Sequence, residues 1–278
     1  MNHTPCRQRT FPFWLAYEFE YHYIFSLRWL KHFLERLGRD HTLAVWEDAF
    51  RGYDTSLLES ILAVEWQDAP EQYAAEMEEQ LTAFAASHFP VAGVSAEEAR
   101  HLIDHMPPFE QIRRHFSTLD VMREITTYQA LHLFRDSLAL IAEGMLARYR
   151  KAGELIVYDA VLEEWSPEPG EEMEAAEYLR QRAERFSKEP EEADIHSAGL
   201  QVELLRATDS EVVTRVTECE WARYYQEHHP RVGYLLACSA DNAAYRSTNH
   251  RLRLQRTTTL MERGTECDFR VYDVEAQE

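Results

Sequence analysis

Basic residues are scarce in this chain of 278 residues. Lysine and arginine total 29 against 49 aspartates and glutamates, which gives a formal net charge of −20 at pH 7. A surface of this sign repels a phosphate backbone, so we expect no nucleic-acid partner. Glycine is scarce as well, and none of the 9 glycines forms the G-x-G-x-x-G or G-x-x-x-x-G-K loops that hold nucleotide phosphates. The composition therefore argues against a nucleotide-binding protein.

Long apolar runs are absent too. No stretch approaches the ~20 apolar residues that a membrane-spanning helix needs, and acidic and histidine side chains interrupt the N-terminal segment where a secretion signal would lie. The four cysteines, Cys6, Cys219, Cys238 and Cys267, form no C-x-x-C pair and are too widely spaced for a disulfide framework. We therefore expect a cytoplasmic protein with reduced thiols and no membrane partner.

Helical spacing of apolar residues dominates the first part of the chain. The spacing predicts a long helix over Phe13–Leu37, which ends where Gly38 follows. Further helices are predicted over Leu119–Tyr149 and Glu154–Trp165, with Gly153 as the break between them. The sequence up to residue 165 is therefore predicted to be mostly α.

Two Ser-x-x-Glu sequences predict helix starts in the same region. Ser56 with Glu59, and Ser95 with Glu98, fit the capping box, in which the serine hydroxyl accepts a hydrogen bond from a free amide of the first turn. The opening helix is also rich in aromatic residues. These either pack against other helices of the same chain or form a homodimer through the N-terminal helices.

The hydrophobic period changes in the C-terminal part. Residues 163–192 contain 11 acidic and 4 basic residues and predict a solvated connector or cover with a polar helix over Glu172–Lys188. Alternating residues then predict four strands of an antiparallel sheet, over Leu200–Arg206, Glu211–Cys219, Leu252–Thr259 and Glu266–Tyr272. We expect an α+β protein with a helical region at 1–120 and an α+β domain at 121–278.

Arginine is concentrated in one stretch of this acidic chain. No acidic residue lies between Asp241 and Glu262, whereas four arginines do: Arg246, Arg251, Arg253 and Arg256. A guanidinium forms two parallel hydrogen bonds with a carboxylate, so Arg256 is a candidate for binding an anionic substrate. The alternative is that these arginines face solvent on an amphipathic strand.

Three short motifs lie near the C-terminus, in a stretch that holds three of the four cysteines. They are Cys238-x-x-Asp241, Arg256-Thr257-Thr258-Thr259-Leu260 and Gly264-x-x-Cys267-Asp268-Phe269-Arg270. Together they resemble the signature of the L-2-amino-thiazoline-4-carboxylic acid hydrolase family. The resemblance is clearest over about the last 60 residues, extends weakly back through Tyr128–Trp165, and does not cover residues 1 to about 120.

The resemblance implies a hydrolase that opens a cyclic amidine in a small heterocycle bearing a carboxylate. In the family's named reaction, water adds to ring carbon 2 of the thiazoline and N-carbamoyl-L-cysteine is released. That chemistry needs a nucleophile, a proton donor and groups that hold the substrate. The implied catalytic residues are Cys238, Cys267, Asp241 and Asp268, with either cysteine as nucleophile, and the implied substrate-binding residues are Arg256, Thr257 and Arg270.

Two alternatives remain open at this point. A cysteine mechanism requires no cofactor, but zinc is an alternative, with Cys219, Cys238, Cys267 and His229 as candidate ligands; buried cysteines can also be simple small hydrophobes. The closing Gly-x-x-Cys-x-Phe pattern also resembles 4-vinyl reductase-type domains, which implies a non-catalytic small-molecule-binding or sensing protein. The Arg256-Thr257 pair and Asp241 favour the hydrolase, because a pocket for apolar ligands does not need them.

Overall fold

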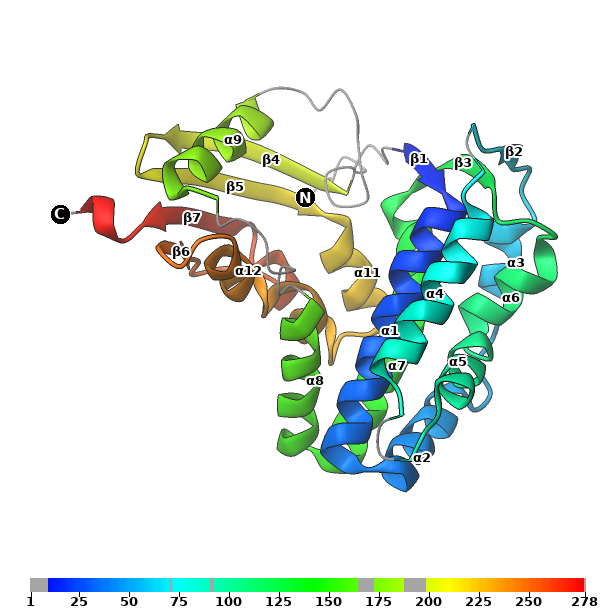
Figure 1. The fold of residues 1–278 in the computed structure, drawn as a ribbon. Coiled ribbons are helices and arrows are strands. Elements are labelled where there is room, and N and C mark those ends of the chain that lie inside the picture. Colours follow the sequence, from blue (N-terminus) through cyan, green and yellow to red (C-terminus); the bar gives the residue numbers. More distant parts are fainter. Residues whose placement is uncertain (1–9, 71, 91–92, 165–172, 188–198, 278) are drawn as a thin grey trace. The chain divides into compact units, whose positions relative to one another are not determined.

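The chain divides by its contacts into two compact units. The computed structural model describes residues 10–70, 72–90, 93–164, 173–187 and 199–277 (Figure 1). The sheet unit comprises Met1–Phe11, Thr126–Tyr128 and Val161–Glu278, and the helical unit comprises Pro12–Ile125 and Gln129–Ala160. Within the described ranges, no helix has the length and apolar character that crossing a bilayer requires. Cys6 and part of the acidic connector lie outside the described residues.

Helices make up most of the helical unit. Its elements, some of which extend a few residues into the sheet unit, are β1 (Thr10–Trp14), α1 (Leu15–Leu37), α2 (Arg39–Phe50), α3 (Ser56–Leu62), β2 (Gln67–Asp68), α4 (Ala74–His88), α5 (Ala96–Asp104), α6 (Pro107–His115), β3 (Val121–Thr126), α7 (Thr127–Tyr149) and α8 (Lys151–Glu164). Helix α1 contacts α2, α4 and α5. It contributes the large, fully buried side chains Phe19, Tyr23 and Trp29 to the core. The aromatic residues of the opening helix thus mainly pack inside this chain.

The opening helix ends as predicted but begins later. Gly38 follows α1 with a φ of 78°, a backbone conformation that favours glycine, and its amide donates to the Leu34 carbonyl. Phe13 is not helical, because Thr10–Trp14 form a strand in which Phe11 and Phe13 are buried and their neighbours are exposed. The alternation in this short segment outweighs the helical spacing that follows it.

One of the two predicted capping boxes is present. The Ser95 hydroxyl accepts a hydrogen bond from the Glu98 amide at 3.1 Å and starts α5. A helix also starts at Ser56 as predicted, but Ser56 does not cap it. The residue preceding α3 is Thr55, whose hydroxyl donates to the Glu59 carboxylate at 2.8 Å, and Ser56 is already the first helical residue.

Two further predictions in this region were wrong. Val121–Thr126 form strand β3, at the centre of a small sheet in the order β1-β3-β2, so the predicted helix begins only at Thr127. Gly153 lies inside α8 rather than between two helices; the break is at Arg150, whose φ is 52°. Glycine is required at 153 for another reason: a Cβ there would lie 2.3 Å from the Met145 carbonyl oxygen of α7.

The sheet unit contains the predicted antiparallel sheet. Its elements are α9 (Ala175–Ser187), β4 (Leu200–Ala207), β5 (Glu211–Cys219), α11 (Glu220–His228), the π-helix η1 (Tyr234–Cys238), α12 (Asp241–Thr248), β6 (Leu252–Gln255), the 3-10 helix η2 (Leu260–Glu262), β7 (Cys267–Asp273) and η3 (Glu275–Gln277). The strands pair antiparallel in the order β4-β5-β7-β6. The prediction for β6 was too long, because the chain leaves the ladder after Gln255.

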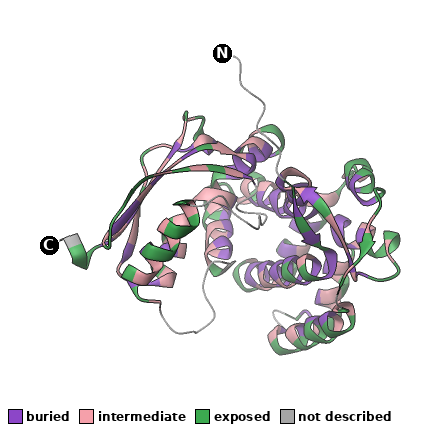
Figure 2. Cartoon of the chain, turned by 90° about the horizontal axis from the view of Figure 1, so that it is seen from above, coloured by how far each residue is buried: buried purple, intermediate pink, exposed green. Residues whose placement is uncertain are grey.

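Helix α9 covers part of the sheet. Its residues Ala175 and Leu179 share a buried cluster with Val212, Leu252 and Val271 of the strands and with Tyr245 of α12. The predicted polar helix over Glu172–Lys188 therefore exists as a shorter helix with one buried face. Figure 2 shows the same pattern, with buried residues inside each unit and exposed residues along outer helix faces.

We expect Gly153→Ala and Gly144→Ala to have opposite effects on stability. Alanine favours a helix over glycine by about 1 kcal/mol, and a Cβ at Gly144 would only touch Val45 at 3.6 Å. Gly144→Ala should therefore raise the free energy of unfolding slightly, whereas Gly153→Ala should lower it by about 2 kcal/mol because α8 must move away from Met145. Urea unfolding of both variants checks this; similar values for the two would contradict it.

Candidate functional site

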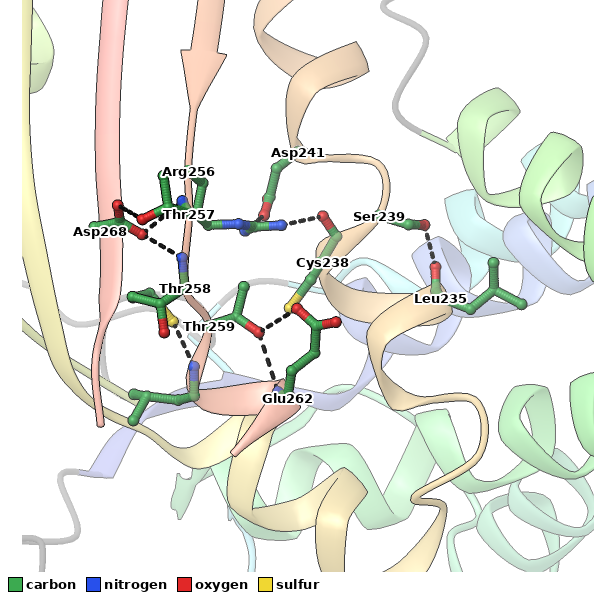
Figure 3. Close-up of polar contacts among 12 residues, drawn as sticks. Leu235, Cys238, Ser239, Asp241, Arg256, Thr257, Thr258, Thr259, Glu262 and Asp268 are labelled. Carbon is green, nitrogen blue, oxygen red and sulfur yellow. Dashed lines mark hydrogen bonds and ion pairs between the residues drawn. The ribbon is translucent and has the colours of Figure 1, made fainter. Parts of the chain in front are cut away.

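The three C-terminal motifs meet at the edge of the sheet where β6 ends and β7 begins. The connector between these strands carries the Arg256–Leu260 motif, β7 begins at Cys267, and α12 begins at Asp241. Figure 3 shows the resulting cluster, in which Arg256 lies between Asp241 and the backbone of Cys238. The tertiary structure thus brings together residues that the sequence places up to 30 positions apart.

Arg256 is at the centre of this cluster. Its side chain is only 8% exposed, and it forms an ion pair with the Asp241 carboxylate. The second terminal nitrogen donates to the Cys238 carbonyl oxygen at 3.0 Å. The guanidinium also lies 5.1 Å from the centre of the Phe269 ring and 5.9 Å from that of Tyr234. Both ends of the guanidinium fork are therefore occupied by groups of the protein itself.

The surroundings of Asp241 change the pKa of its carboxyl. Asp241 is the first residue of α12, where the amides of the first turn favour a negative charge. Burial raises the pKa of the carboxyl, while Arg256 and, more weakly, Arg182 oppose that rise. Burial alone would lower the pKa of Arg256, but Asp241 and Cys238 raise it, so the guanidinium stays charged. The pair is largely shielded from water, because the Arg256 side chain is 8% exposed and that of Asp241 is 29% exposed.

Three cysteines lie near this ion pair. Burial raises the pKa of Cys219 to about 12, opposed by a hydrogen bond that its sulfur accepts from the Ala222 amide at 3.4 Å. Burial raises the pKa of Cys238 as well, and Asp241 adds to that rise while Arg256 opposes it. The pKa of Cys267 is raised by burial, and its sulfur accepts from the Leu260 amide at 3.1 Å. All three are therefore protonated thiols at neutral pH.

The cysteines differ in accessibility. Cys267 is buried, whereas Cys219 and Cys238 are partly exposed. In Figure 3 the Cys238 side chain points toward the turn formed by Thr259 and Glu262. Thr259 closes that turn through a hydroxyl that accepts from the Glu262 amide at 3.0 Å. Cys238 is thus the thiol that combines partial exposure with direct backbone contact to Arg256.

Asp268 binds the connector rather than a cysteine. Because successive strand residues point to opposite faces, Asp268 faces away from Cys267. Its carboxylate accepts hydrogen bonds from the Thr257 hydroxyl at 2.7 Å, the Thr257 amide at 2.8 Å and the Thr258 amide at 2.7 Å. Burial raises the pKa of Asp268, but these donors outweigh it and lower the pKa below its usual value. Asp268 and Thr257 therefore fix the path of the segment that presents Arg256.

Two glycines and a glutamine hold the surrounding loops. The Gln226 amide nitrogen of α11 donates to the Leu260 carbonyl oxygen at 2.6 Å. A Cβ at Gly264 would lie 2.3 Å from the Thr258 hydroxyl, and a Cβ at Gly233 would lie 2.5 Å from the Tyr225 side chain. Any larger residue at these glycines would push the connector or η1 away from the site.

Two predicted site residues have other contacts. Arg270 donates to the Glu211 carboxylate at 2.6 Å and to the Gln255 side chain at 3.0 Å on the sheet. His229 follows α11 and has ring contacts with Tyr224 and Tyr225. Within the part of the chain that the structure describes, no three His, Cys, Asp or Glu side chains gather in a way that could hold a metal ion. Zinc stays a prediction.

The aromatic residues around the arginine were missed by sequence reasoning. Tyr234 is 40% exposed and lies on η1 four residues before Cys238. Its position four residues before Cys238 could have indicated that the two side chains lie close together, since residues four apart share a helix face. Phe269 belongs to the third motif, and its contact with Arg256 depends on the pairing of β6 with β7.

A known family covers the segment that holds this cluster. The family model described as L-2-amino-thiazoline-4-carboxylic acid hydrolase matches residues 130–271, just over half of the chain. The chain belongs to this family. The match contains Cys219, Asp241, Arg256 and every other residue of the cluster, and it begins within α7. No curated protein and no solved structure matches the chain.

Breaking the ion pair in this family member should destabilise the fold. Arg256→Met should lower the free energy of unfolding by about 2 kcal/mol, because it leaves the partly buried Asp241 carboxylate without its partner. Adding Asp241→Asn should recover part of this loss. Arg246→Met, at an exposed position of α12, is the control and should change stability by less than about 0.5 kcal/mol. Chemical denaturation measures all three; no recovery in the double variant would contradict the pairing.

The lowered pKa of Asp268 predicts an acid-dependent loss of stability. The carboxylate stabilises the fold above its unfolded pKa of 3.8, and this contribution is lost as the pH falls through the lower native pKa. Asp268→Asn should be less stable than the wild type near neutral pH by about 1–2 kcal/mol, and this difference should shrink at about pH 3. Asp209→Asn, in the exposed β4–β5 turn, is the control. A constant difference across pH would contradict the assignment.

Proposed function

We propose that the protein hydrolyses the cyclic amidine of a small thiazoline-type heterocycle that carries a carboxylate. The observation that supports this most is the buried Arg256–Asp241 pair beside the Cys238 thiol, inside the segment that matches the hydrolase family. A cationic amidine binds to a carboxylate, and an anionic carboxylate binds to a guanidinium. The ring carbon between nitrogen and sulfur is attacked by a nucleophile.

Cys238 is the proposed nucleophile. It is partly exposed, whereas the Cys267 sulfur is buried and accepts a backbone hydrogen bond. In the proposed first step, the Cys238 sulfur bonds to the amidine carbon and the bond from that carbon to the ring sulfur breaks, so the ring opens. Water then bonds to the same carbon and the bond to Cys238 breaks. One proton of the water ends on the former ring nitrogen and the other on the Cys238 sulfur, and a urea product leaves with a free thiol. No oxidant or reductant is needed.

Proton transfer in this mechanism falls to Asp241. Because burial raises its pKa, Asp241 holds a proton more readily than an exposed aspartate does. It would accept the proton of the Cys238 thiol and return it to the departing ring sulfur. A cationic amidine beside Asp241 would also lower the pKa of the thiol, so the thiolate would form only when substrate is bound.

The test is turnover of L-2-amino-thiazoline-4-carboxylate, followed as N-carbamoyl-L-cysteine by mass spectrometry. Cys238→Ser should lower kcat by about a thousandfold or more, because the hydroxyl is a far weaker nucleophile. Cys267→Ser should retain most of the activity. Urea unfolding of each variant separates lost chemistry from lost folding.

The same assay tests zinc. Cys219→Ser should retain turnover under the thiol mechanism but lose it if Cys219 is a zinc ligand. Metal analysis of the purified protein, and turnover after treatment with a chelator, provide the second measurement. A folded wild type that gives no product would contradict the hydrolase proposal and favour the non-catalytic binding protein of the 4-vinyl reductase type.

A further inference from the structure

Arg182 of α9 is a cation at the edge of the site that has no acidic partner among the residues that the structure describes. Its guanidinium lies 4.8 Å from the centre of the Phe186 ring and 5.1 Å from that of Tyr245. Its Nε atom is buried and donates no hydrogen bond to any described residue. No carboxylate of the described chain pairs with it, although the neighbouring Arg180 pairs with Glu177 on the exposed side of the same helix.

Arg182 lies near Asp241, because its ring contact Tyr245 is on the same helix as Asp241. Tyr245 follows Asp241 by four residues on α12, so both side chains lie on the same face of that helix. Burial raises the pKa of Asp241 and that of Tyr245, and the charge of Arg182 opposes both rises. The buried contacts of Ala175 and Leu179 with the sheet hold α9 in this place. The charges of two arginines therefore act on the Asp241 carboxyl: Arg182 from α9 and Arg256 from the segment after β6.

The two arginines differ in what they can still bind. Arg256 already donates to the Asp241 carboxylate and to the Cys238 carbonyl, so its fork is filled. Arg182 stacks on aromatic faces, an arrangement that leaves the N–H edge of a guanidinium available for a bidentate contact with a carboxylate. Asp241 likewise uses only its Oδ2 atom for Arg256 and keeps its second oxygen without a hydrogen bond from the described residues.

We infer that Arg182 binds the carboxylate of the substrate while the free oxygen of Asp241 binds its amidine. The inference deepens the proposed function and rests on it. A 2-amino-thiazoline carboxylate carries these two groups on opposite sides of one small ring. Its negative end would meet the unpaired cation, and its amidine carbon would lie on the side of Asp241 where Arg256 contacts Cys238. Arg256 then acts as a positioning residue that holds Asp241.

Ligand binding tests this without relying on turnover. The probe is 2-aminothiazole-4-carboxylate, an aromatic analogue that resists ring opening, measured by calorimetry. Arg182→Met should weaken its binding at least about tenfold, because the bidentate contact is lost. Arg180→Met, the same change on the exposed side of α9, should leave binding within about twofold. Arg182→Lys should restore part of the affinity because it keeps the charge.

Substrate selectivity gives the second readout. Arg182→Met should raise KM for 2-amino-thiazoline-4-carboxylate about tenfold with little change in kcat. Turnover of 2-amino-2-thiazoline, which lacks the carboxylate, should be unaffected. Equal losses for both compounds would assign Arg182 a merely structural role and overturn the inference, as would an Arg182→Met variant that binds the analogue as well as Arg180→Met does.

The outcomes separate this inference from the proposed function. A wild type that binds the analogue through Arg182 but opens no ring would contradict the hydrolase proposal and leave carboxylate recognition by Arg182 supported. A wild type that turns over the substrate, with Arg182→Met unchanged, would support the proposed function and overturn the inference. A folded wild type that neither binds nor turns over would overturn both.

Discussion

The buried ion pair between Arg256 and Asp241 is the contact on which the candidate site depends. It links the start of α12 to the segment that follows β6, and through the Cys238 carbonyl it also holds the end of η1. An ion pair removed from water stabilises a structure only when both charges are well satisfied. The neighbouring contacts meet that condition, since Asp268 fixes the segment before η2 and Gln226 fixes η2 itself. The sheet thus holds the segments that place Arg256 beside Asp241.

The charges around the site also determine the protonation state of its cysteine thiols. With a net charge of −20, the chain offers few cations to lower a thiol pKa, and burial raises the pKa of every described cysteine of the cluster. A reactive thiolate is therefore absent from the resting site. In the mechanism proposed above, the positive charge that a thiolate needs comes from the bound substrate, which limits side reactions of an accessible cysteine.

Much of the fold could be predicted from local patterns. The end of α1 at Gly38, the strands β4 and β5 with their turn, and the start of α5 at Ser95 follow from residues within a few positions of one another. The failures have a common cause. Strand β3 and strand β1 are short and owe their conformation to pairing with distant segments, which a sequence window does not contain. Gly153 was misplaced because the atom that requires it belongs to the preceding helix.

The sequence by itself determined the antiparallel period of the C-terminal strands, the excess of negative charge and the motifs that carry the family resemblance. It also identified Cys238, Asp241 and Arg256 as belonging together. Only the tertiary structure decided what these residues contact: that the Arg256 fork is filled by Asp241, that Asp268 binds backbone amides, and that Arg182 arrives from α9. The physical reason is that hydrogen-bond partners are chosen by the packing of whole elements, whereas sequence patterns report only the preferences of each element alone.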